Sequence, residues 1–187
     1  LTPEERKALA PLLDRPITHA QNIPANNRSF VQNWKLEDLF PELDKPRKPD
    51  LASGRQAFVD AQCLTCHRFG NDGGIVGPEL TGVGSKYTPR DILESVIEPS
   101  KVINEQYQNH TAIMKDGDTI SGRLVSQSNT EVILETDRLN GTTEKIPSAD
   151  LTELKPSALS PMPEGLVNSL TKDEIVDLVT YLRGGPN

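Results

Sequence analysis

Cys63-Leu64-Thr65-Cys66-His67 carries the strongest structural signal in this 187-residue chain. Two thiols separated by two residues can each form a thioether to a porphyrin, and the imidazole that follows them can then bind the iron. The pattern therefore predicts one covalently attached haem c, with Cys63 and Cys66 as the attachment points and His67 as the first axial ligand of the iron.

Two other kinds of site use a similar pattern. A zinc site needs two further ligands, normally from a second Cys/His cluster, but the chain has no cysteine besides Cys63 and Cys66, and its other histidines, His19 and His110, stand alone. A thioredoxin-like dithiol opens a helix after an apolar strand, whereas the residues before Cys63 have the pattern of a helix end. Covalent haem is the interpretation that the sequence favours.

A second axial ligand is expected from Met162. It lies in Ser160-Pro161-Met162-Pro163, where prolines on both sides stiffen the loop and prevent a helix, so a weak thioether ligand can be held at little entropic cost. His110 is the main rival, Met114 has the surroundings of a packing residue, and His19 has those of a solvated side chain. The metal ligands are therefore predicted to be His67 and Met162, and no catalytic residue is expected.

The ring nitrogen of His67 that does not face the iron needs an acceptor, which sets the orientation and basicity of the imidazole. Gly77-Pro78 follows at a suitable distance along the chain, so the carbonyl group of Pro78 is the predicted acceptor. The plausible hydrogen-bond donors to the haem propionates are Trp34, Arg68, Lys86, Tyr87 and Arg90.

Composition narrows the class of partner and the compartment. The net charge of -7 argues against nucleic acid, and no apolar run approaches the roughly 18 residues of a membrane span. Haem attachment to this motif takes place outside the cytoplasm in bacteria, so we expect a periplasmic or otherwise exported protein. Because the chain begins at Leu1 rather than Met, we expect a processed product or a piece of something larger.

The helical signals divide the chain into two parts. Residues 1–49 are expected to form an N-terminal helix from Thr2 followed by a Pro-rich wrap or linker, and residues 50–187 the haem domain. Within the haem domain, helices are predicted over 51–61, from the cap Thr88 to about 97, and from the cap Thr171 to Gly184.

Between the second and third of these helices the hydrophobic period changes from helical to alternating. Four short runs rich in Thr, Val and Ile, with turn signals between them, predict an antiparallel β-insertion at about 106–154. The runs are 107–114, 119–125, 131–136 and 142–146, and the turn signals are Asp116-Gly117 and Asn140-Gly141.

Taken together, several stretches resemble the planctomycete and verrucomicrobial type of haem-binding cytochrome c domain over about residues 34 to 183. They are residues 62–84, Ile97-Glu98-Pro99-Ser100-Lys101-Val102-Ile103, the Asp116-Gly117 hairpin, Ser160-Pro161-Met162-Pro163 and the last helix. The resemblance implies a mainly α, class I-like cytochrome c fold with a small inserted antiparallel β-subdomain. It also implies haem c on Cys63 and Cys66, with His67 proximal and Met162 distal.

The expected function is transfer of single electrons, from a fused or docked dehydrogenase to a respiratory carrier such as a cytochrome or an oxidase. Such a domain is not itself an enzyme, although it can form part of a larger oxidoreductase. Two alternatives remain open: a haem-based gas sensor or peroxidase in which the distal ligand is displaced, and a partner-binding or homo-oligomerising module that acts through the β-insertion.

Overall fold

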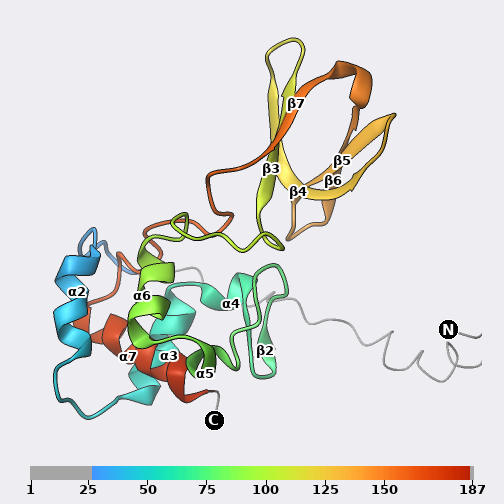
Figure 1. Cartoon of the computed structure of the whole chain (residues 1–187). Helices are drawn as coiled ribbons and strands as arrows, with labels where there is room; N and C mark the ends of the chain where they lie inside the picture. Colours follow the sequence, from blue (N-terminus) through green and yellow to red (C-terminus); the bar gives the residue numbers. More distant parts are fainter. Residues whose placement is uncertain (1–26, 186–187) are drawn as a thin grey trace, which may run out of the picture.

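The computed structural model describes residues 27–185, which form a helical body and, beside it, a five-stranded antiparallel sheet (Figure 1). Of the described residues, 32% are helical and 24% lie in strands. The expectation of a mainly α fold is therefore wrong. The helices are short, and loops occupy much of the helical body. The sheet contains one strand more than the four that the sequence pattern predicted.

The helical body is built from four helices of eight or more residues. They are α2 (Leu36–Leu43), α3 (Leu51–Asp60), α6 (Pro89–Ile97) and α7 (Lys172–Gly184). The predicted caps of the last two are confirmed: Thr88 and Thr171 each form a capping box with the acidic residue three positions later. The helix α2, which includes Pro41, lies within the stretch before residue 50 for which a Pro-rich wrap or linker was expected.

Helices α3 and α7 cross at close range at Gly54 of α3. A Cβ atom on Gly54 would lie 2.3 Å from the carbonyl oxygen of Asp177 and 2.7 Å from the Cβ of Tyr181. The ring of Tyr181 packs against those of Phe58 and Phe69, with centroids 6.1 and 5.0 Å away. This aromatic cluster is the centre of the core of the helical body.

The sheet has the strand order β6-β5-β4-β3-β7. Its strands are β3 (Asn109–Met114), β4 (Thr119–Gln127), β5 (Glu131–Asp137), β6 (Thr142–Pro147) and β7 (Leu151–Pro156). Gly117 and Gly141 adopt φ angles of 94° and 68° in the two predicted turns, a conformation that glycine allows without strain. A second apolar core, centred on Ala112, Val132, Leu134 and Ile146, belongs to the sheet alone.

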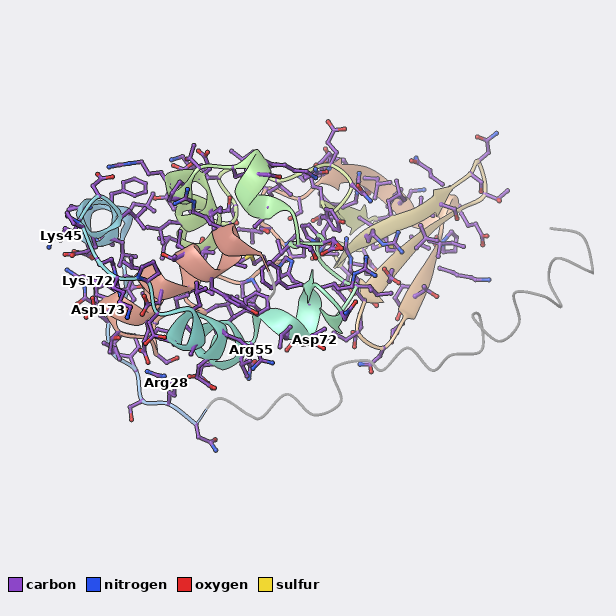
Figure 2. All side chains as sticks on the ribbon, turned by 90° about the horizontal axis from the view of Figure 1, so that it is seen from below. Arg28, Lys45, Arg55, Asp72, Lys172 and Asp173 are labelled. Atoms are coloured by element: carbon purple, nitrogen blue, oxygen red, sulfur yellow. The ribbon has the colours of Figure 1, made fainter. Side chains whose placement is uncertain are left out.

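Two connecting segments, 98–108 and 157–170, join the sheet to the helical body (Figure 1). The amide of Ser160 donates to the hydroxyl of Ser100 at 3.1 Å, so the two connections are tied to each other. Figure 2 places Lys45, Lys172 and Asp173 at the end of the helical body that lies farthest from the sheet. The helix predicted from Thr2 falls outside the described residues.

Candidate haem-binding site

The two cysteines lie on one short helical turn between α3 and a small hairpin. Gln62 adopts a left-handed conformation with a φ of 58°. This conformation turns the chain after α3, and α4 (Cys63–Cys66) begins at the next residue. The amide of His67 donates to the carbonyl of Cys63 at 2.9 Å and closes the turn. Residues three apart on a helix are neighbours on its surface, so both thiols can reach the same edge of a flat ring.

The imidazole of His67 is held by the residue that the sequence indicated. Its Nδ1 lies 2.8 Å from the carbonyl oxygen of Pro78. A carbonyl can only accept, so Nδ1 carries the proton in this contact. Burial lowers the pKa of His67, and the hydrogen bond to Pro78 opposes that effect. The ring is thus neutral at neutral pH, with Nε2 left as the nitrogen that can bind a metal.

Glycine is required beside this imidazole. A Cβ atom on Gly77 would lie 2.7 Å from Cε1 and 2.9 Å from Nδ1 of His67. A Cβ atom on Gly74 would similarly lie 2.3 Å from the carbonyl oxygen of Thr65. The loop therefore packs its bare backbone against the motif, which leaves the imidazole no freedom to rotate away. This donor set and this close packing fit a haem held by two thioethers and one imidazole.

The loop after the motif is folded back onto it by backbone hydrogen bonds. It begins with a hairpin of β1 (Arg68–Phe69) and β2 (Asp72–Gly73). The amides of Gly74, Gly77 and Leu80 then donate to the carbonyls of Leu64, Cys66 and Arg68 at 2.8 to 2.9 Å. These bonds set the position of Pro78 relative to His67, which are eleven residues apart in sequence.

Glu79 locks the end of this loop. Its carboxylate accepts hydrogen bonds from the hydroxyl of Thr81 and, at 2.8 Å, from the amide of Thr81, and the guanidinium of Arg68 lies 3.0 Å away. The Thr81 hydroxyl group is in turn 2.8 Å from the amide of Gly70, from which it accepts. The bonds from Thr81, with a smaller effect of Arg68, lower the pKa of Glu79 to about 2.

Cys63 and Cys66 are free thiols. Burial raises the pKa of Cys63 to about 12. Burial also raises the pKa of Cys66, against an opposing effect of the positive charge of Arg138. Cysteines of redox dithiols have lowered pKa values, so these thiols differ from a thioredoxin-like pair and suit a structural attachment.

Met162 is half-buried in a loop that is anchored to the segment after α6. Its amide donates to the Ser160 hydroxyl at 3.1 Å, and that residue is tied to Ser100 as described above. Of the rival ligands, Met114 packs on the core of the sheet and His110 lies in β3. His19 is outside the described residues. The assignment of Met162 as distal ligand stays a prediction.

Three of the five candidate propionate donors have other partners in the structure. The indole of Trp34 donates to the carbonyl of Leu170 at 3.0 Å, Arg68 pairs with Glu79 as above, and Arg90 pairs with Asp44. Lys86 and Tyr87 are exposed. Arg68 and Arg90 are exposed as well, so Trp34 is the buried member of this set.

Arg138 is a residue of this region that sequence reasoning missed. It follows β5, far from the motif in sequence, yet its guanidinium donates to the carbonyl of Val76 at 3.4 Å. No local pattern marks such a contact, because Arg138 stands in an ordinary turn sequence next to Asn140-Gly141.

Known proteins match the part of the chain that contains the motif. The family described as Cytochrome c matches residues 51–124, which run from α3 to the middle of β4. Cytochrome c oxidase subunit 2 from Alkalihalophilus pseudofirmus is 30% identical over 71 residues, or 38% of this chain. The chain spans about one fifth of the length of that relative, since the match covers 20% of it. The chain therefore contains a cytochrome c domain, the kind of module that transfers electrons through a covalently bound haem.

Proposed function

We propose that this chain carries one haem c and passes single electrons from a dehydrogenase, fused or docked, to a respiratory carrier. The observation that carries the proposal is the 2.8 Å contact between His67 Nδ1 and the carbonyl of Pro78. It orients a neutral imidazole one residue after two free thiols, in a region that matches the cytochrome c family. A metal-binding imidazole normally donates its other N–H to such an acceptor.

Each residue of the proposed site has a separate task. Cys63 and Cys66 attach the porphyrin, Nε2 of His67 binds the iron, and Pro78 fixes the orientation of His67. Met162 is proposed to bind the iron from the opposite side. The bound haem supplies an iron that alternates between ferrous and ferric states, and a thioether opposite an imidazole favours the ferrous state.

This ligand set suits electron transfer rather than turnover of a substrate. If His67 and Met162 both held the iron, small molecules would be excluded from it, and neither oxygen nor peroxide would be activated. The domain is then not an enzyme by itself, and its partners are redox proteins. The match covers 20% of the length of the relative. A place for this domain within a larger oxidoreductase is consistent with that coverage.

We further propose that the haem domain occupies residues 50–187, with the sheet inserted at about 106–154, and that it belongs to the planctomycete type. Cytochrome c domains are typically exported, and we propose the periplasm or another exported location. Among residues 27–185, no helix combines the length and hydropathy that a membrane crossing demands.

The decisive experiment is mass spectrometry and optical spectroscopy of the chain matured with a haem attachment system. The expected result is one added haem, resistant to acid acetone, and a reduced spectrum with the sharp bands of a six-coordinate c-type cytochrome. A chain without an added haem would refute the proposal.

The distal ligand is tested by a matched pair of variants. Met162→Ala should lower the reduction potential and allow rapid binding of carbon monoxide to the ferrous form. Met114→Ala removes the same side chain from the edge of the sheet core and should leave the potential and the ligand binding unchanged. Rapid carbon monoxide binding by the unaltered protein would instead favour a gas sensor or peroxidase with a displaceable ligand.

A further inference from the structure

Arg138 is a largely buried cation whose ion pair with Glu135 is long and shared. Its side chain is 11% exposed, although burying a charge is costly unless a partner compensates it. The nearest carboxylate described is that of Glu135, 3.9 Å from Nε, and this carboxylate already accepts from Arg123 at 2.8 Å. Burial lowers the pKa of Arg138, but a guanidinium keeps its proton in proteins, so the positive charge remains.

The guanidinium joins the sheet to the loop that holds the imidazole. One terminal nitrogen donates to the carbonyl of Tyr107 at 3.0 Å and lies 3.3 Å from the side-chain oxygen of Asn109. The other donates to the carbonyl of Val76 at 3.4 Å. The remaining donor, Nε, is buried and has no hydrogen-bond partner. Arg138 therefore donates its hydrogen bonds to backbone and amide oxygens, and the long ion pair with Glu135 compensates its charge in part.

The loop carbonyl that Arg138 contacts lies next to the haem ligands. Val76 directly precedes Gly77, whose amide donates to Cys66 and whose backbone packs on the ring of His67. A shift of the turn after β5 would thus move both the attachment point and the residue that precedes Pro78.

We propose that Arg138 is a positioning residue of the haem site: it links the sheet to the loop that orients His67 and keeps a fixed positive charge at the carbonyl of Val76, which raises the reduction potential of the bound haem. This inference rests on the proposed function. A nearby cation disfavours the more positive ferric state, and the effect is strong where water is excluded. The sheet then acts on the haem through one side chain rather than through a shared core.

Three variants of the haem-loaded chain test the inference. Arg138→Gln removes the charge and retains an amide that can donate to Val76. Arg138→Lys keeps the charge and loses the forked geometry. Lys145→Gln is the matched control, because Lys145 is an exposed residue of the same sheet, on β6, and its loss changes the net charge by the same amount. Haem content, reduction potential and hydrogen exchange of residues 74–80 are measured for each.

The expected result is a change of about tenfold in the ferric-to-ferrous equilibrium for Arg138→Gln, in favour of the ferric state, which equals about 59 mV for a one-electron couple. Arg138→Lys should retain most of the potential while exchange in residues 74–80 becomes faster. Lys145→Gln should alter neither quantity.

The outcomes separate the two proposals. Absence of haem from the unaltered chain would defeat the proposed function, whatever Arg138 does. Full haem loading with the same potential in Arg138→Gln as in Lys145→Gln would overturn the role of Arg138. Faster exchange without any shift in potential would reduce Arg138 to a structural contact and would equally overturn the inference.

Discussion

The helical body and the sheet are stabilised in different ways. The body has the larger core, with three aromatic rings packed at tilted or edge-to-face angles and α3 crossed tightly against α7. The sheet has a small aliphatic core and is held by four antiparallel ladders. The residues proposed to hold the haem, Cys63, Cys66, His67 and Met162, lie outside the sheet, so the proposed chemistry belongs to the helical body and its connections, and the sheet acts on it through Arg138.

The difference also concerns local stability. Two helices of the body, α4, which carries Cys63 and Cys66, and α5 (Val83–Lys86), have four residues each. A single helical turn is unstable by itself in water. The strands of the sheet are six to nine residues long and pair along most of their length. We therefore expect the helical body to depend on the cofactor, and the sheet to be independent of it.

The largest expected effect comes from removing both attachment points. Cys63→Ala with Cys66→Ala should abolish covalent haem and speed hydrogen exchange around α4 and α5, because the porphyrin supplies packing that these short helices lack. Exchange in the sheet should stay slow, since its core is separate. Mass spectrometry measures both quantities. Equal loss of protection in the two regions would show that they form one cooperative unit.

Core truncations compare the two regions directly. Leu93 in α6 and Leu134 in β5 are both fully buried, with 0% exposure. Replacing either by Ala should cost about 2–5 kcal/mol of the free energy of unfolding, measured by urea denaturation. Leu134→Ala should speed exchange in the sheet alone, and Leu93→Ala in the helices alone. A haem potential that shifts as much in Leu134→Ala as in Leu93→Ala would contradict this separation.

Two glycines offer a finer version of the same comparison. A Cβ atom on Gly54 would lie 2.3 Å from the backbone oxygen of Asp177 in α7, and one on Gly122 would lie 2.5 Å from that of Glu135 in β5. Each Gly→Ala variant should lose about 1–3 kcal/mol through overpacking, measured as a lower unfolding midpoint. Gly141→Ala serves as a control for strain without a clash, because its φ is positive and no atom lies within 4 Å of the added Cβ.

The smallest effect concerns pH. The pKa of Glu79 is about 2 in the folded chain against an ordinary value of 4.5, so the unfolded chain binds the proton more readily. Its contribution to stability is complete above about pH 4.5 and is lost as the pH falls towards 2. Glu79→Gln should therefore unfold earlier than the parent at neutral pH, and this difference should shrink in acid. Thermal midpoints from pH 7 to 2.5 measure it.

Glu153→Gln, on the exposed part of β7, is the control for that pH series. This variant removes a carboxylate of the sheet whose ion pair, among the described residues, is with the exposed Lys155. Exposed ion pairs contribute little to the free energy of unfolding. If the thermal midpoint of Glu153→Gln differed from that of the parent with the same pH dependence as for Glu79→Gln, the net charge of the chain, rather than the network of Glu79 with Thr81, would govern stability in acid.

Much of the local structure could be predicted because its signals are local. Thr88 and Thr171 stand three residues before an acidic partner, and a capping box needs nothing beyond that spacing. The glycines of the two hairpin turns likewise require only their own φ angles. The strand β7 was missed because its positions do not alternate between buried and exposed: Leu151 and Leu154 are half-buried, and the other four residues are exposed. Its pairing with β3 supplies the stability.

By itself, the amino-acid sequence determined the haem motif, the proline-flanked methionine, the helix caps and the expected acceptor of His67, because each depends on residues close together in the chain or on the chemistry of one side chain. The tertiary structure alone decided the balance of helix and sheet, the locking of the loop by Glu79 and the arrival of Arg138 beside Val76. Such contacts join segments up to 62 residues apart, and no local pattern encodes a partner that only folding brings near.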